Sequence, residues 1–397
     1  MTSTAPGTLT LRPLGLQGPG EAEVCGAVPG AQINGTQQTA LRPLAGGPLA
    51  FGHCEAVWRS DGALERAVLE RAILERAVLP LADLPDWAER RAPGQGRLAE
   101  ALLERLSRPR SPLAGLSLDR PRIMGILNVT PDSFSDGGHR ADPALAVRDG
   151  LAMLEQGADI LDVGGESTRP GARPVTLDEE RARVLPVVRA LAEAGACVSI
   201  DTRHAAIMRE AVAAGARIIN DVTALGGDPD SLGAAAEAGV PVVLMHMQGD
   251  PQTMQQAPRY GHVALDIYDY LAARLEACAA AGIAAGQVVV DPGIGFGKTV
   301  THNLQLLEQI ALFQGLGCPV LLGASRKSFI GKLSRGEPAK ARLPGSLAAV
   351  LFALQRGVQI IRVHDVAETR QAVDVWQAMT LAPSAFEAPD SAAPPLV

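Results

Sequence analysis

Polar side chains end each of eight apolar segments beyond residue 120 of this chain. The eight positions are Asn128, Glu166–Arg169, Asp201, Asn220-Asp221, His246, Asp291, Ser325–Lys327 and Arg362 with His364. Amides, carboxylates and cations of this kind bind polar substrates and stabilise the charge that develops in a transition state. One such residue alone is explained as a helix N-cap, which is an alternative role for Asp201 and Asp221. Eight at equivalent positions indicate a site that is built from the ends of many strands.

The last two positions carry a cluster of cationic groups. Lys327 ends the seventh apolar segment, and Arg362 and His364 end the eighth. Only four of the 36 basic residues of the chain are lysines, so a lysine at such a position favours a site for a compact ammonium group. With a neighbouring hydroxyl and backbone NH groups, these cations suit a phosphorylated substrate. The alternative is a surface set of ion pairs that includes Asp365.

Two other positions indicate different chemistry. The neutral amide oxygen of Asn128 suits Mg²⁺, which keeps most of its waters and takes few protein ligands, whereas the alternative role is that of a turn residue. Asp291 ends an apolar segment, where a lone carboxylate is costly to bury unless it is paired. It could accept two NH bonds from an amidine-like ring edge, and Asn220 and Asp201 could bind other ring nitrogens. Backbone amides that satisfy each carboxylate are the structural alternative.

The elements that must hold these groups alternate between apolar runs and helical patterns. The apolar runs are Ile123–Val129, Asp159–Val163, Cys197–Ile200, Arg217–Asn220, Pro241–Met245, Val288–Asp291, Pro319–Leu322 and Gln359–Val363. The helical patterns include Leu177–Ala194, His204–Ala214, Val263–Ala281, Asn303–Gln314 and Val366–Met379. Continuous apolar runs are typical of parallel strands that are buried on both faces. Eight such units predict a (β/α)8 TIM barrel, with an open doubly wound sheet as the alternative, and in a barrel all strands end on one face.

Composition excludes several classes of function. The formal net charge of −7 argues against nucleic-acid binding and against a polybasic membrane-surface role. Five scattered cysteines without a C-x-x-C pair predict reduced thiols, a cytoplasmic location and no zinc site. We expect no targeting segment and no membrane span, because no apolar run is long enough to cross a bilayer. Pro292 breaks the G-x-x-x-x-G-K pattern of a P-loop, and motifs of zinc and serine hydrolases do not occur.

The first 115 residues form an N-terminal extension to which the sequence assigns no role. Its start, to about Gly47, is rich in Pro, Gly, Thr and Gln and is expected to be loosely ordered. A five-residue unit of strong helix formers occurs three times from Leu64 and predicts a helix that ends at Pro80. Arg97–Leu106 predicts a second helix. The predicted divisions are therefore a partly helical extension over 1–115, a barrel over 116–383 and a flexible tail over 384–397.

Several motifs together resemble the dihydropteroate synthases, over a stretch from about Arg120 to Met379. The motifs are Met124–Gly138, Asp162–Gly171, Ser199–Thr202, Asp291–Lys298, Ser325–Lys327 and Arg362–His364. The resemblance implies a transferase of folate biosynthesis that joins 6-hydroxymethyl-7,8-dihydropterin diphosphate to p-aminobenzoate and releases diphosphate. One departure is Ser346, where the family commonly has threonine, and this change keeps the hydroxyl.

The resemblance also implies a role for each matching residue. Asn128 would be the protein ligand of a Mg²⁺ cofactor on the departing diphosphate. The expected pterin contacts are Asp201, Asn220, Asp291, Met245 and Phe296. The diphosphate would be held by Arg362 and His364, and Lys327 would reach both substrates. The expected p-aminobenzoate contacts are Phe134, Thr168, Arg169, Pro170 and Ser325. Catalysis is expected from Asp201, Lys327 and Arg362, and no general base is required because the aniline nitrogen is already a nucleophile.

Two other functions fit parts of the pattern. A methyltetrahydrofolate-corrinoid methyltransferase uses a similar barrel but needs no diphosphate site, so the cationic clusters argue against it. A catalytically silent paralogue would bind pterin or a partner protein, and only the unexplained extension favours it. The expected partners are small-molecule substrates, and a homodimer is what the family implies.

Overall fold

The second part of the chain folds into a closed barrel of parallel strands. The computed structural model describes residues 8–18, 41–59, 74–130, 143–166, 175–249 and 253–382. The strands pair in the order β11-β10-β9-β8-β7-β6-β13-β12. They are β6 (Arg122–Asn128), β7 (Ile160–Gly164), β8 (Val198–Asp201), β9 (Ile218–Asp221), β10 (Val242–Met245), β11 (Val288–Asp291), β12 (Leu321–Leu322) and β13 (Ile360–Val363). A parallel bridge between Val290 and Val320 joins the two ends of this order, so the predicted eight-stranded barrel is confirmed.

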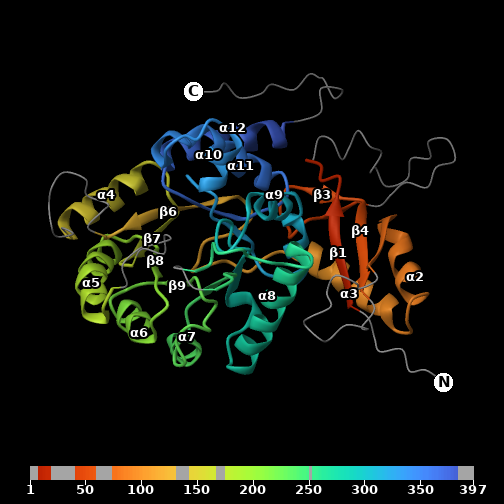
Figure 1. Ribbon diagram of the computed structural model, residues 1–397, viewed down its shortest axis with the longest axis horizontal. Helices are drawn as coiled ribbons and strands as arrows, with labels where there is room; N and C mark the ends of the chain where they lie inside the picture. Colours follow the sequence, from red (N-terminus) through yellow and green to blue (C-terminus); the bar gives the residue numbers. More distant parts are fainter. Residues whose placement is uncertain are drawn as a thin grey trace, which may run out of the picture.

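Helices surround the barrel on its outer side (Figure 1). They are α4 (Pro143–Glu155), α5 (Leu177–Glu193), α6 (Ala205–Ala213), α7 (Ser231–Ala238), α8 (Val263–Ala280), α9 (Val300–Glu308), α10 (Ser328–Leu333), α11 (Leu343–Leu354) and α12 (Val366–Leu381). α5 begins where a capping box forms: Thr176 Oγ1 accepts from Glu179 N at 3.2 Å, and Glu179 Oε2 accepts from Thr176 N at 3.0 Å. The predicted helix 303–314 is α9 followed by a 3₁₀ segment, Ile310–Leu316.

Apolar side chains fill the barrel at the amino ends of its strands. One cluster contains Met124, Ile160, Cys197, Ile218, Val243, Val289, Leu321 and Ile360. Leu113 and Leu118, from the segment before β6, complete this cluster and cover its lower end. Because this floor is apolar and packed, ligands can be bound only toward the carboxyl ends of the strands.

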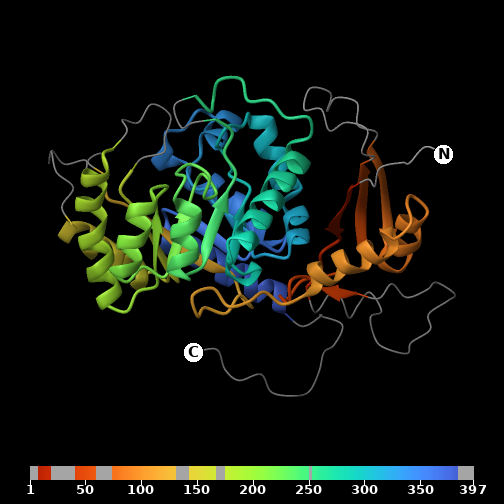
Figure 2. The ribbon, with the colours of Figure 1, turned by 90° about the horizontal axis from the view of Figure 1, so that it is seen from below.

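An N-terminal module packs beside α8 and α9 (Figures 1 and 2). Its three-stranded antiparallel sheet has the order β1-β4-β5. The module contains β1 (Thr8–Leu14), β2 (Arg42–Pro43), β3 (Ala50–Phe51), β4 (His53–Arg59), β5 (Leu74–Pro80), α2 (Leu84–Glu89) and α3 (Gln95–Ser107). It has its own apolar core, in which Leu11, Phe51 and Leu106 are fully buried.

The prediction of a helix that runs to Pro80 was wrong for the end of that segment. Residues 74–80 form β5, which pairs with β4 along its whole length, and Ala77 and Leu79 pack against the core of the module. Cross-strand pairing therefore overrides the helix propensity of these residues. The rest of the repeat, residues 60–73, lies outside the described residues.

Other predictions for the extension had mixed outcomes. Thr8–Leu14 is a strand, so the expectation of loose order was wrong there, and α3 confirms the helix predicted at 97–106. The division at residues 115 and 116 and the end of the barrel at 383 stay predictions. The tail 384–397 lies outside the described residues. Within the described ranges, no helix combines the length and the apolar character that a membrane span needs.

Arginines join the module to the barrel. Arg59 of β4 donates to both oxygens of Asp269 on α8, at 2.6 and 2.7 Å. Arg110 is 9% exposed and donates to the Gln314 carbonyl oxygen at 2.9 Å and to the Arg105 carbonyl oxygen at 2.8 Å. Burial lowers the pKa of Arg110 to about 10, so the group remains charged at neutral pH.

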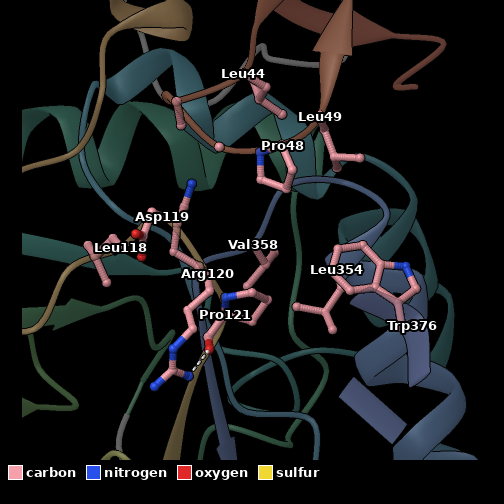
Figure 3. A pocket seen from close by; sticks show the side chains of 14 residues that line it. Leu44, Pro48, Leu49, Leu118, Asp119, Arg120, Pro121, Leu354, Val358 and Trp376 are labelled. Atoms are coloured by element: carbon pink, nitrogen blue, oxygen red, sulfur yellow. Dashed lines mark hydrogen bonds between the residues drawn. The ribbon is translucent and has the colours of Figure 1, made fainter. Parts of the chain in front are cut away.

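A small hollow lies at the same junction (Figure 3). Leu44 and Leu49 of the module face Leu354 and Trp376 of the barrel across it. Arg120 also lines the hollow, but its guanidinium pairs with Asp159 at 2.7 Å. The hollow is therefore an apolar seam between two packed units.

We predict that Arg110→Met lowers the free energy of unfolding by about 1–3 kcal/mol, because the carbonyl oxygens of Gln314 and Arg105 each lose a hydrogen bond from the guanidinium. Urea unfolding followed by circular dichroism measures the change. The control is Arg108→Met, because Arg108 is exposed and its ion pair among the described residues is with the exposed Glu104. A loss no larger than that of the control would show that the buried guanidinium does not hold the two units together.

Candidate functional site

Arg362 lies at the centre of the polar end of the barrel. Its Nε donates to Asp162 Oδ2 at 2.6 Å, and its Nη2 donates to Asp201 Oδ2 at 2.7 Å. The three residues come from β13, β7 and β8, so the barrel itself brings them together. Burial lowers the pKa of Arg362, but the two carboxylates raise it more, so the pKa lies above its usual range. The group is therefore a permanent cation at the floor of the site.

Asp201 depends on this cation for its charge. Burial raises the pKa of Asp201 to about 7, and the neighbouring carboxylate of Asp162 raises it as well, while Arg362 opposes both effects. A carboxylate in this setting is a strong hydrogen-bond acceptor only as long as Arg362 stays beside it. The pair thus forms one electrostatic unit.

Asn220 and Asp291 lie near the same cation. Asn220 donates through Nδ2 to Asp162 Oδ2 at 3.0 Å. A Cβ at Gly323 would lie 3.9 Å from Asp291 Oδ2 and 4.0 Å from Arg362 Cβ, which places Asp291 on the Arg362 side of the barrel mouth. Asp291 Oδ1 accepts from Gly293 N at 2.7 Å. Burial raises the pKa of Asp291, and this backbone bond opposes the rise.

The loop after β11 requires glycine because other parts of the protein lie close to it. Gly293 has φ +70°, and a Cβ there would lie 2.0 Å from the His246 carbonyl oxygen. Gly295 has φ +84°, and a Cβ there would lie 3.0 Å from Lys327 Cδ. The stem of Lys327 can therefore cross the loop, and its Nζ lies 3.9 Å from the centre of the Phe296 ring.

A buried lysine supports this loop from below. Lys298 is 3% exposed and His246 is 7% exposed. Lys298 Nζ donates to the Phe296 carbonyl oxygen at 2.8 Å and lies 3.1 Å from His246 Nδ1. Burial lowers the pKa of His246 to about 3, and Lys298 adds to the shift. His246 is thus a neutral, paired histidine, and it follows the buried Met245 of β10.

The predicted ion-pair alternative exists, but it involves a different cation. Arg326, with φ +58°, donates to both carboxylate oxygens of Asp365, one of them at 3.0 Å. Ser325 Oγ lies 3.0 Å from His364 Nδ1 and accepts from His364 N at 3.2 Å. Asp365 therefore neutralises Arg326, whereas Arg362 has the partners described above.

Asn128 ends β6, where it pairs in register with Gly164 of β7. A Cβ at Gly164 would lie 3.5 Å from Asp201 Cβ, so Asn128 is one strand away from the Asp201–Arg362 pair. Within the described part of the chain, no hydrogen bond engages the Asn128 side chain, which is partly exposed. Four predicted residues lie outside the described residues: Phe134, Thr168, Arg169 and Pro170.

Sequence reasoning gave no role to two buried charged residues of this site. Asp162 binds both Arg362 and Asn220, and Lys298 holds the loop after β11. An ionisable residue inside the apolar run Ile160–Val163 was the available signal for Asp162. The scarcity of lysine was the signal for Lys298.

The titration of His246 generates a prediction about stability. Between its folded pKa of about 3 and its ordinary value of 6.5, only the unfolded chain binds the proton. Neutral His246 should therefore make its full contribution to the free energy of unfolding above pH 6.5. This free energy should fall as the pH drops toward 3. His246→Asn keeps an acceptor for Lys298 but cannot titrate. The difference in free energy of unfolding between wild type and this variant should therefore shrink with acidification, by on the order of a few kcal/mol.

Urea unfolding at several pH values between 4 and 8 measures this difference. His53→Asn, at an exposed position of β4, is the control and should follow the wild type. A difference between His246→Asn and wild type that does not change with pH would contradict the assignment.

Comparison with known proteins agrees with this geometry. Residues 124–364 match the pterin binding enzyme family. The dihydropteroate synthase of Escherichia coli (strain K12) is 49% identical over 264 residues, which cover 66% of this chain and 93% of that protein. A structure of Xanthomonas albilineans dihydropteroate synthase with 4-aminobenzoic acid is 50% identical, with a TM-score of 0.65, and covers 69% of this chain and 99% of that chain.

A second Xanthomonas albilineans structure, in complex with 7,8-dihydropteroate, is 47% identical with a TM-score of 0.63. The match covers 69% of this chain and 100% of that chain. The matched family region begins at residue 124, so the N-terminal module lies outside it. The chain belongs to the dihydropteroate synthase family of pterin-binding transferases.

Proposed function

We propose that this protein joins 6-hydroxymethyl-7,8-dihydropterin diphosphate to p-aminobenzoate, which yields 7,8-dihydropteroate and diphosphate in folate biosynthesis. One observation carries the proposal: hydrogen-bonding groups that match a pterin and cations that match a diphosphate meet around Arg362. Relatives of the same family supply independent support, since one is seen with 4-aminobenzoic acid and another with 7,8-dihydropteroate.

The pterin would be held by the carboxylates and the amide at the barrel mouth. Asp291 keeps one oxygen on Gly293 N, so its other oxygen can accept from the ring. Asn220 and Asp201 would accept or donate along the remaining edge, and Met245 and Phe296 would contact the ring faces. A ring that offers fewer donors would leave buried acceptors unpaired, which gives the site its selectivity.

The diphosphate would be held by cations and a metal. Arg362 uses two NH groups for its carboxylates, and a guanidinium has five, so three remain for other acceptors. His364 and Lys327 would add to the cationic side. The Asn128 amide oxygen fits Mg²⁺, because it is a hard oxygen donor at the mouth and is not engaged by the described residues. When bound, Mg²⁺ would supply charge neutralisation on the leaving group.

In the reaction, the bond between the pterin methylene carbon and the diphosphate oxygen breaks, and the diphosphate leaves with the electron pair. The electron-rich pterin carries the positive charge that develops, and the carboxylates of Asp201 and Asp291 would stabilise it. The amine nitrogen of p-aminobenzoate then bonds to the methylene carbon and loses a proton. Lys327 would act in both steps, the departure of diphosphate and the attack by p-aminobenzoate. Its stem crosses Gly295 on the pterin side.

Five residues are expected to contact p-aminobenzoate. Ser325 is buried and contacts His364, so it lies beside the cationic side of the site. Phe134, Thr168, Arg169 and Pro170 belong to the loops after β6 and β7 and stay predictions. These loops would cover the second substrate and exclude water while the diphosphate leaves.

The activity assay is diphosphate release by purified protein with the pterin diphosphate, Mg²⁺ and p-aminobenzoate. We expect release that depends on p-aminobenzoate and that falls at least a hundredfold, roughly, in Lys327→Ala and Asn128→Ala, because each loses charge stabilisation at the leaving group. Lys340→Ala, at an exposed lysine, is the control and should match wild type. Pterin binding without release would favour the silent paralogue, and methyl transfer from methyltetrahydrofolate would favour the corrinoid enzyme.

We infer in addition that the protein is a cytoplasmic homodimer. Large apolar side chains are exposed on two adjacent helices: Phe352 of α11 at 37%, and Val375 and Met379 of α12 at 54% and 67%. Large exposed apolar side chains on neighbouring helices are a feature of protein contacts. Cys54, Cys197, Cys278 and Cys318 are free and buried, which suits a reducing compartment.

We predict that Val375→Glu converts the dimer into a monomer, because a carboxylate cannot be buried unpaired in an apolar interface. Light scattering after size exclusion should give twice the chain mass of 41.3 kDa for wild type and the chain mass for the variant. Val78→Glu is the matched control, because Val78 is 62% exposed on β5 of the N-terminal module. A monomeric wild type would refute the dimer.

A further inference from the structure

Asp162 occupies a position that the substrate-binding roles leave unexplained. Its side chain is fully buried, at 0% exposure, inside the barrel. A single oxygen, Oδ2, accepts both from Arg362 Nε at 2.6 Å and from Asn220 Nδ2 at 3.0 Å. The three residues lie on β7, β13 and β9, which are every second strand of the sheet. Side chains from alternate strands share one layer of such a barrel, so these three form a layer directly below the mouth.

This contact decides which end of the Asn220 amide faces the substrate. The two ends of an asparagine amide have nearly the same shape but opposite hydrogen-bonding character. An ionised carboxylate only accepts hydrogen bonds, so Asp162 selects the NH₂ group of Asn220. Because the amide is planar, its carbonyl oxygen then points away from Asp162. Asn220 consequently holds its carbonyl oxygen in a fixed direction as an acceptor for whatever binds above, and one N–H of its NH₂ group is left over.

The same oxygen also orients Arg362. With Nε on Asp162 and Nη2 on Asp201, the planar guanidinium is held at two points and cannot turn about its stem. Its remaining NH groups are thereby aimed in a fixed direction. One buried carboxylate thus sets the orientation of a pterin contact and of a diphosphate contact at once.

We propose that Asp162 is a positioning residue of the pterin site, which makes Asn220 select a ring that donates a hydrogen bond and which aligns Arg362 beside it. The inference rests on the proposed function for the identity of the ring. Asp162 does not itself need to touch the substrate. The opposing view is that Asp162 serves only as a counter-ion that stabilises the barrel.

Binding of a set of pterins separates the two views. The set comprises 6-hydroxymethylpterin and derivatives in which one ring NH or amino donor is replaced by a methylated nitrogen. Isothermal titration gives the dissociation constant of each, and the ratio between the best and the blocked pterin is the discrimination. We expect Asp162→Leu to reduce the discrimination about tenfold to a hundredfold, because the Asn220 amide can then turn and present its NH₂ group.

Two further variants keep the test decisive if Asp162→Leu does not fold. Asp162→Asn preserves the volume and should lose part of the discrimination, since it weakens the selection of the NH₂ group. Asn220→Ala should lose by itself the part of the discrimination that Asn220 provides, and adding Asp162→Asn to it should change nothing more. Additive losses in this cycle would overturn the proposal, because they would mean that Asp162 does not act through Asn220.

Asp159→Asn is the matched control. Asp159 is also a buried aspartate, with 8% of its side chain exposed, and it pairs with Arg122 at 2.9 Å next to β7 but at the amino end of the barrel. It should lower stability and leave the discrimination unchanged. If Asp162→Asn behaves in the same way as Asp159→Asn, Asp162 is only structural. Wild-type turnover is measured in parallel, so a protein that discriminates pterins without releasing diphosphate would retain this inference while the proposed function fails.

Discussion

The rest of the site depends on one largely buried cation, Arg362, which has 20% of its side chain exposed and is held between two carboxylates. Removing a partner from such a buried pair typically costs about 3–5 kcal/mol, since it leaves an uncompensated charge. The pairing of Arg362 with Asp162 and Asp201 is therefore a condition for folding the polar end of the barrel, before any ligand is considered. It also leaves the mouth with a surplus of carboxylates, once Asp291 is included. The proposed anionic leaving group would then need further positive charge, which Lys327 and a divalent cation near Asn128 would supply.

The loop after β11 is rigid for a different reason. Gly293 lets the His246 carbonyl oxygen lie close to the loop, and Gly295 does the same for the Lys327 side chain. Lys298 Nζ donates to the Phe296 carbonyl oxygen of the loop. Neither the glycines nor the lysine need to contact a substrate. They hold the loop that carries Phe296, whose ring centre lies 3.9 Å from Lys327 Nζ. Buried groups behind the loop thus hold the predicted site residues in place.

The sequence predicted the barrel well because its signal is local. Strands that are buried on both faces are continuous apolar runs, and the polar residue that follows each run marks its carboxyl end. The role of Asp162 was not predictable in this way, because its partners Asn220 and Arg362 lie 58 and 200 positions away. The same limit applies to Asp365, since only the fold decides that it pairs with Arg326 and not with Lys327. The prediction for β5 was wrong because pairing with β4 outweighs the helix propensity of its residues.

Within the described residues, the N-terminal module contacts the outside of the barrel. Its contacts run to the outer helices, as in the pairing of Arg59 with Asp269 and the position of Arg76 Nη2 at 2.7 Å from His262 Nε2. Within the described ranges, none of the side chains that converge on Arg362 comes from the module. His262 is nevertheless the N-cap of α8, and Tyr260 just before it donates to the Gly297 carbonyl oxygen at 2.8 Å. The module therefore contacts α8, and the segment just before α8 is tied to the loop after β11 through Tyr260.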